Sequence, residues 1–93
     1  MVWHGYEMYV YMLKSIESDY RYFGMTDNLH RRLAEHNRGD NKTTKAKRPY
    51  AMWILATCET SAEARLIEKQ FKTGYGRLKA DRMIADGRAK KVI

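Results

Sequence analysis

Residues 8–14 (MYVYMLK) and 20–26 (YRYFGMT) decide the fold of this chain. Both stretches are rich in aromatic and β-branched residues, which favours β-strands. Because side chains alternate along a strand, Tyr9, Tyr11 and Leu13 share one face of the first stretch and the residues between them share the other. Both faces are largely apolar, so we expect a central strand that is covered on both sides.

Turn-forming residues 15–19 (SIESD) separate the two stretches and predict a β-hairpin. With a loop at residues 15–18, the register places Tyr11 directly opposite Tyr22, and both rings project from one face. A shift of this register by one residue would put the two rings on opposite faces.

Residues 28–38 (NLHRRLAEHNR) follow a helical pattern. Leu29 and Leu33 lie on one stripe at helical spacing, which predicts the face that packs on the sheet. Asp27 is a suitable N-cap, and Gly39 is placed to end the helix.

The same helical spacing separates two adjacent arginines. Arg32 and His36 lie on the border of the apolar stripe, where a side chain can extend towards the sheet. Arg31 points away from the stripe, and we expect it to be solvated.

The second half of the chain predicts one more strand and two more helices. Residues 50–58 (YAMWILATC) form an apolar strand pattern, and Thr60 with Glu63 matches a capping box at the start of a helix that reaches about residue 73. A last helical segment covers residues 77–86. The order ββαβαα predicts an α+β fold, with a small three-stranded antiparallel sheet flanked by helices.

Composition limits the class of protein. A chain of 93 residues with 44% hydrophobic and 31% charged residues fits one domain, residues 1–93, with one core. No apolar run approaches the roughly 20 residues of a membrane helix. The single cysteine, Cys58, excludes an internal disulfide, so we expect a cytoplasmic protein.

The charge indicates a class of partner. Eighteen Lys and Arg residues against eleven Asp and Glu residues give a formal net charge of +7, which attracts polyanions such as DNA or RNA. Four of these cations, Lys42, Lys45, Lys47 and Arg48, lie in the polar loop 39–49 (GDNKTTKAKRP). They either contact nucleic-acid phosphates or only solvate the loop.

Several motifs resemble those of the GIY-YIG nuclease superfamily. Tyr9-Val10-Tyr11 and Tyr22-Phe23-Gly24 are similar to its two name-giving elements, although Tyr9 and Phe23 replace a glycine and an isoleucine. The resemblance is closest to small single-domain bacterial members, and more distant to the nuclease module of the excision-repair incision subunit.

The resemblance extends along the chain from about residue 8 to residue 72. Residues 24–37 (GMTDNLHRRLAEHN) resemble the family's helix, with its arginine at Arg32 and, where present, its histidine at His36. Residues 67–72 (IEKQFK) resemble the segment that carries its glutamate, here Glu68. Some members have a lysine directly after the second motif, where this chain has Met25.

The resemblance implies a metal-dependent DNA endonuclease that uses one divalent cation, Mg²⁺ or Mn²⁺. Glu68 is the expected metal ligand, because a carboxylate is a hard oxygen donor. Arg32 is expected to hold the phosphate. Tyr11 is the candidate general base or water-positioning hydroxyl, and Tyr22 is expected to orient the water or the phosphate. Because a free tyrosine has a pKa near ~10, base action by Tyr11 requires a pKa lowered by the metal or Arg32.

Each of these residues also has a structural interpretation. Glu68 could form a surface ion pair with Lys72, and the two tyrosines could be core residues. His36 could bind phosphate, shuttle a proton or simply pack at the helix border. Gly24 could admit a nucleic-acid backbone or mark a β-bulge.

Three functions therefore remain as hypotheses at this point. The first is a metal-dependent DNA endonuclease, for which selectivity for a DNA structure or a role in repair or recombination are open alternatives. The second is a catalytically silent module that binds DNA or RNA. The third is a nuclease that needs a protein partner for targeting.

Overall fold

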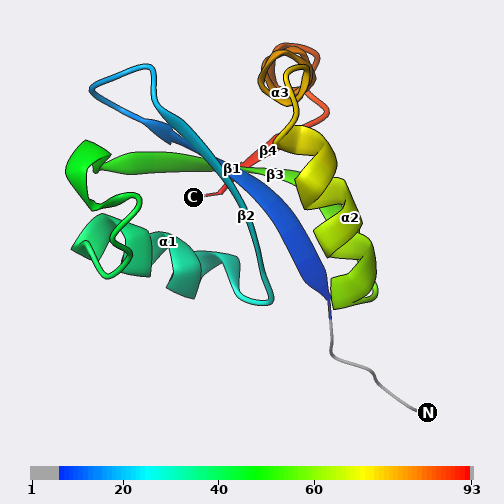
Figure 1. Ribbon diagram of the computed structural model, residues 1–93, viewed down its shortest axis with the longest axis horizontal. Helices are drawn as coiled ribbons and strands as arrows, with labels where there is room; N and C mark the ends of the chain where they lie inside the picture. Colours follow the sequence, from blue (N-terminus) through cyan, green and yellow to red (C-terminus); the bar gives the residue numbers. More distant parts are fainter. Residues whose placement is uncertain (1–6, 93) are drawn as a thin grey trace.

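The computed structural model describes residues 7–92 as a four-stranded antiparallel sheet covered by helices on both faces (Figure 1). The strand order is β2-β1-β3-β4. The elements are β1 (Met8–Ser15), β2 (Arg21–Thr26), α1 (Leu29–Arg38), the short 3₁₀ helix η1 (Lys45–Lys47), β3 (Tyr50–Cys58), α2 (Ser61–Phe71), α3 (Gly76–Ala85) and β4 (Lys90–Val92). No helix within the described part of the chain is long and apolar enough to cross a membrane.

The two faces of β1 supply two separate apolar clusters, as its alternating pattern predicts. On one face, Met8, Val10 and Met12 pack with residues of α2 and α3 such as Phe71 and Ala80. On the other face, Tyr11 and Leu13 pack with residues of β3 and with Leu29 and Leu33 of α1. The expected central strand is confirmed, and Figure 1 shows α1 on one side of the sheet with α2 and α3 on the other.

The α+β class with a small antiparallel sheet is confirmed, and the sheet gains a fourth strand. In β4, Lys90 pairs with Ile54 and Val92 pairs with Met52 of β3. The sequence predicts three strands and no element after the last helix. This strand has three residues and two of them are lysines, so it has no apolar alternation from which to predict it.

The hairpin register differs from the prediction by two residues. Tyr11 pairs with Gly24, and Tyr22 pairs with Leu13. The reason is that Ser15 continues the strand: its backbone N–H donates to the carbonyl of Tyr20, so that the turn lies at residues 16–19. A shift of two residues keeps the face of every side chain, and Tyr11 and Tyr22 therefore still share one face.

Helix α1 begins one residue later than predicted. Asn28, and not Asp27, is the N-cap, because the Asn28 side chain accepts a hydrogen bond from the backbone N–H of Arg31 at 3.0 Å. Gly39 ends the helix in the left-handed conformation, with φ of 90°, as expected. Thr60 caps α2 through the backbone N–H of Glu63, as its capping-box position predicts.

Candidate active site

Tyr11 lies at the centre of the candidate site and is almost completely buried, with 1% of its surface exposed. Its ring covers Gly24 on the neighbouring strand. A Cβ atom added at Gly24 would lie 2.5 Å from the Tyr11 hydroxyl oxygen, closer than real Cβ contacts allow. Gly24 therefore makes room for Tyr11. This explains the glycine without a nucleic-acid contact, and such a contact stays a prediction.

His36 projects from α1 into the same buried space and is 0% exposed. Its Nε2 atom lies 2.9 Å from the Tyr11 hydroxyl, and its Nδ1 atom lies 2.7 Å from Thr44 Oγ1. Burial, followed by the positive charge of Arg32, lowers the pKa of His36 to about 4. The imidazole is therefore neutral near pH 7. A neutral histidine does not bind phosphate as a cation, and the proton-shuttle and packing interpretations of His36 both stay predictions.

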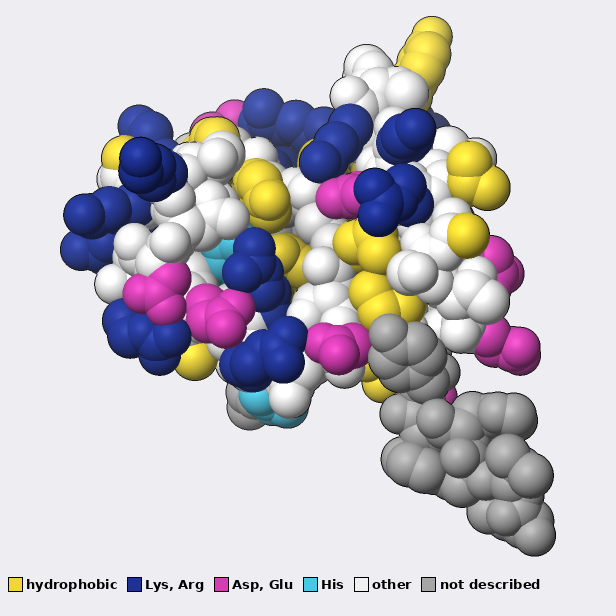
Figure 2. All heavy atoms as spheres, turned by 60° about the horizontal axis from the view of Figure 1, so that its bottom comes forward, with side chains coloured by type: hydrophobic (Ala, Val, Ile, Leu, Met, Phe, Trp, Pro, Cys, Tyr) yellow, Lys and Arg dark blue, Asp and Glu magenta, His cyan; other side chains and the backbone are white. Residues whose placement is uncertain are grey.

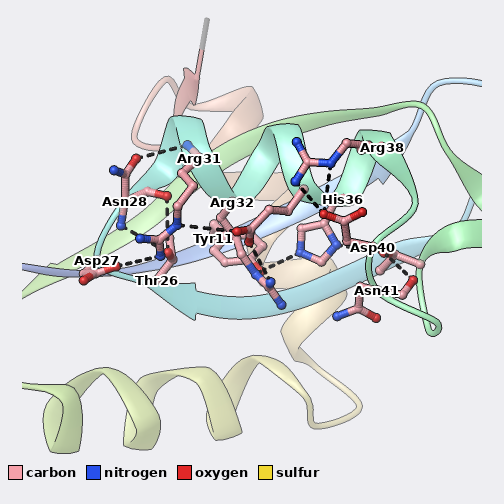
Figure 3. Close-up of polar contacts among 12 residues, drawn as sticks. Tyr11, Thr26, Asp27, Asn28, Arg31, Arg32, His36, Arg38, Asp40 and Asn41 are labelled. Carbon is pink, nitrogen blue, oxygen red and sulfur yellow. Dashed lines mark hydrogen bonds and ion pairs between the residues drawn. The ribbon is translucent and has the colours of Figure 1, made fainter.

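Arg32 joins the buried tyrosine to the protein surface. Its Nε donates to the Tyr11 hydroxyl at 3.4 Å, and its Nη1 donates to Glu35 Oε1 at 3.0 Å. Figure 3 shows Arg32 and His36 extending from α1 towards Tyr11. The neighbouring Arg31 is 55% exposed at its side chain and pairs with Asp27 and Glu35. Helical spacing thus separated the two arginines correctly.

The pKa of Tyr11 is raised to about 12 because burial disfavours the phenolate. The hydrogen bond and charge of Arg32 act in the opposite direction but are weaker. The sequence analysis required a lowered pKa for base action, and the structure has the opposite shift. Tyr11 is therefore a neutral phenol near pH 7 in this state, and any role as a base requires that its own proton leaves at the same time.

Glu68 reaches the site from α2, and its negative charge is one of the causes that raise the pKa of Tyr11. Its side chain is 17% exposed, and Lys72 Nζ lies 3.3 Å from Glu68 Oε2. The same Lys72 Nζ lies 5.9 Å from the centre of the Tyr22 ring. The ring centroids of Tyr22 and Tyr11 are 6.5 Å apart. The ion pair of Glu68 and Lys72, which was the structural alternative to a metal-binding role, thus exists, and its lysine lies next to Tyr22.

The donor set fits a magnesium-type ion bound largely by water and substrate. No group of three or more His, Cys, Asp or Glu side chains within residues 7–92 is arranged to hold a metal ion. Mg²⁺ commonly uses one or two protein carboxylates and takes its other ligands from waters and substrate phosphates. Glu68 is such a carboxylate at the edge of the site, and a cation there would compete with Lys72 for it.

The basic loop lies beyond the C-terminal end of α1, and all four of its predicted contact residues are exposed. None of them forms an ion pair with another described residue. Figure 2 shows Lys and Arg side chains spread over one molecular face, with acidic, apolar and uncharged atoms between them. The four predicted contact residues are Lys42, Lys45, Lys47 and Arg48.

Two residues of the site were missed by the sequence analysis. Glu35, three residues after Arg32 and four after Arg31, contacts both arginines and lines an open pocket beside them together with Asp27. Its helical spacing was a usable signal. Thr44 is buried against His36 within a polar loop. No periodic pattern in the sequence marks it, because its position depends on how the loop folds back.

Comparison with known proteins shows what the chain is similar to. The family model of the GIY-YIG catalytic domain matches residues 7–81. A UPF0213 protein of Bacillus pumilus is 37% identical over 84 residues, which cover 89% of this chain and 84% of the relative. A UPF0213 protein of Listeria innocua is 40% identical over 67 residues, which cover 71% of this chain and 73% of the relative. No solved structure matches the chain significantly.

Proposed function

The chain belongs to the GIY-YIG family, whose domain is a nuclease domain, and on this basis we propose that it is a metal-dependent endonuclease that cuts DNA. One observation carries the proposal. Tyr11 of β1 and Arg32 of α1 are in contact through a hydrogen bond, and Glu68 of α2 lies close enough for its charge to act on the Tyr11 hydroxyl. A fold that only binds nucleic acid does not need a carboxylate near a buried tyrosine hydroxyl.

Arg32 is proposed to hold the scissile phosphate. Its guanidinium now contacts the Tyr11 hydroxyl, at the long distance of 3.4 Å, and the carboxylate of Glu35. A phosphate oxygen is a charged acceptor that replaces both contacts. Transfer of Arg32 to the phosphate also uncovers the Tyr11 oxygen, which this state of the molecule keeps buried.

Tyr11 and His36 are then proposed to take the proton from the attacking water. The water oxygen bonds to phosphorus, its proton passes to the Tyr11 oxygen, and the phenol proton passes to His36 Nε2, 2.9 Å away. Arg32 is the second cause of the low pKa of His36. A phosphate that neutralises Arg32 therefore makes His36 a better proton acceptor. The bond between phosphorus and the leaving oxygen breaks, and that oxygen takes a proton from a second water.

Glu68 would hold the divalent cation, Mg²⁺ or Mn²⁺. When bound, the cation polarises the phosphate and stabilises the leaving oxygen. Tyr22, next to Lys72, is proposed to orient the phosphate or the water. The basic loop is proposed to contact phosphates further along the strand.

The proposal is tested by cleavage of supercoiled plasmid and of linear, flapped, nicked and four-way-junction DNA with Mg²⁺ or Mn²⁺. Arg32→Ala should abolish cleavage, whereas Arg31→Ala, a matched change on the adjacent residue, should retain most of it. Glu68→Ala should abolish cleavage but leave DNA binding intact or stronger, because it removes a negative charge near the phosphate. Glu59→Ala is its control. Cleavage that survives metal chelation and both active-site substitutions contradicts the proposal.

The competing hypotheses give different results in the same experiment. A silent binding module would bind DNA or RNA and cleave neither with any divalent cation. A nuclease that needs a partner would cleave only after cell extract or a purified partner is added, and Glu68→Ala would abolish that activity too. The preferred DNA structure, a role in repair and the expected cytoplasmic location stay predictions.

A further inference from the structure

The hydroxyl proton of Tyr11 has a single protein acceptor in the described structure. Within residues 7–92, its oxygen has two polar side-chain partners, His36 Nε2 at 2.9 Å and Arg32 Nε at 3.4 Å. A guanidinium only donates hydrogen bonds. Tyr11 is also 1% exposed, so bulk water does not supply the acceptor. The phenol proton must therefore point at His36 Nε2, since a buried donor without an acceptor is costly.

This orientation fixes the tautomer of the histidine. A neutral imidazole carries one proton, and if Nε2 accepts from Tyr11 the proton is on Nδ1. The Nδ1–H group then donates to Thr44 Oγ1 at 2.7 Å. The hydroxyl proton of Thr44 in turn points to the carbonyl oxygen of Asn41, at 3.5 Å. All three protons of this chain of hydrogen bonds thus point in one direction, from Tyr11 towards the loop.

Thr44 is held firmly enough to act as the fixed end of this chain. It is 0% exposed. Its backbone N–H donates to the carbonyl of Asn41 at 3.2 Å, and its own carbonyl accepts from the hydroxyl of Tyr50. The backbone around Thr44 is therefore positioned independently of its side chain.

We propose that Thr44 is a positioning residue that holds His36 as the Nδ1–H tautomer, so that Nε2 is free to accept the proton of Tyr11. The catalytic consequence rests on the proposed nuclease function. With the other tautomer, His36 would donate to the Tyr11 oxygen, and the phenol proton would lose its acceptor. Tyr11 could then neither pass its proton on nor take one from water.

The tautomer is measured directly by two-bond ¹H–¹⁵N correlation spectra of protein labelled with ¹⁵N at histidine. The signals of His36 are identified by their loss in His36→Asn, and exposed His30 serves as the reference for a solvated imidazole. In the wild-type protein near neutral pH, we expect a protonated Nδ1 and a bare Nε2 for His36. A protonated Nε2 with a bare Nδ1 overturns the proposal, whatever any variant does.

Three substitutions then test the role of Thr44. Thr44→Val removes the hydroxyl at nearly the same volume and should give a mixture of tautomers and a kcat lower by roughly tenfold or more, with KM changed far less. Thr44→Ser keeps the hydroxyl and should restore the wild-type spectrum and most of kcat. Thr43→Val is the matched control, because Thr43 is the exposed neighbour. If Thr44→Val folds and leaves both the tautomer and kcat unchanged, the proposal is wrong.

The spectrum separates this inference from the proposed function. If the spectrum shows the expected tautomer but the protein cuts no nucleic acid, the positioning role of Thr44 stands and the proposed nuclease function is contradicted. Metal-dependent cleavage by a protein with a bare Nδ1 would contradict the role of Thr44 and leave the nuclease intact.

Discussion

At the scale of single residues, the absence of a side chain at Gly24 leaves the space that the Tyr11 ring fills. We expect Gly24→Ala to destabilise the protein by about 1–3 kcal/mol, because its methyl group would overlap the Tyr11 hydroxyl, 2.5 Å away, and two paired strands cannot easily separate. Urea denaturation measures the loss. Gly74→Ala is the matched control, since a Cβ at Gly74 meets nothing within 4 Å. Equal stability of the two variants would mean that the Tyr11 ring lies elsewhere.

The lowered pKa of His36 predicts how the stability of the protein changes with pH. Its pKa of about 4 in the folded protein lies below the ordinary value of 6.5, so between these values the unfolded chain binds a proton that the folded protein does not. The contribution of His36 to the free energy of unfolding is therefore fully present above about pH 6.5. It is lost as the pH decreases towards 4, by up to about 3 kcal/mol. Denaturant unfolding at a series of pH values measures this slope.

The control for this slope is His36→Gln, which should be less stable at neutral pH and show a much flatter profile between pH 6.5 and 4. The low pKa values of Asp19 and Asp40 do not confuse the result. Their contribution is lost mainly as the pH falls through and below the ordinary carboxyl value of 3.8, at the acidic end of this window, and it is the same in His36→Gln. An unchanged slope in His36→Gln would show that other titratable groups cause the pH dependence of stability.

At the scale of elements, helix α1 supplies both the arginine that we propose binds phosphate and a carboxylate that pairs with it. Glu35 contacts Arg32 at 3.0 Å and Arg31 at 3.6 Å, so under the proposed function DNA must displace it from Arg32 before the phosphate binds. We expect Glu35→Gln to bind a DNA duplex roughly fivefold more tightly than the wild-type protein, measured with metal chelated.

Asp27→Asn is the matched control, because it removes the same charge near the start of the same helix but contacts Arg31 only. Its effect on affinity should be smaller. In the Arg32→Ala background, the advantage of Glu35→Gln over Asp27→Asn should disappear. If it persists there, Glu35 acts through the overall charge of the surface and not through Arg32.

The elements also show how far the sequence predicts the structure. Alternation along β1 and the helical spacing of Leu29, Leu33 and Arg32 are local properties, and they predicted the sheet faces and the orientation of α1 correctly. The hairpin register depended on whether Ser15 belongs to the strand or to the turn. Its hydroxyl accepts from the backbone N–H groups of Glu17 and Ser18, which a serine in a turn could do equally well.

Parts of the site defined by tertiary contacts could not be predicted in the same way. Strand β4 exists only because Lys90–Val92 pairs with β3. Thr44 becomes important only where the loop folds under His36. The sequence indicated only that base action by Tyr11 requires a pKa lowered by the metal or by Arg32. The arginine is present, but the depth of burial decides the direction of the shift, and depth is a property of the whole fold.

At the scale of the whole molecule, the net charge of +7 should act mainly through the basic loop. We expect Lys45→Gln/Lys47→Gln to weaken DNA binding and to reduce the slope of log K against log salt by about 1–2, because up to two phosphate contacts are lost. Fluorescence anisotropy over a range of salt concentrations measures this slope. Lys90→Gln/Lys91→Gln makes the same change of charge on β4 and should alter the slope less. Equal effects of the two double substitutions would indicate that the positive charge attracts DNA without defined phosphate contacts in the basic loop.

One chain carries one set of Tyr11, Arg32 and Glu68, so a single molecule bound to DNA faces one strand at a time. We therefore expect supercoiled plasmid to become nicked circles first, with linear DNA appearing only after nicks accumulate on both strands. The initial rate should be first order in protein over a range in which sedimentation shows a monomer. Linear product from the earliest times, with a rate that rises as the square of the protein concentration, would show that two chains act together. Glu68→Ala mixed with wild-type protein distinguishes these cases, because an inactive partner would suppress double-strand cutting and leave nicking by wild-type monomers unaffected.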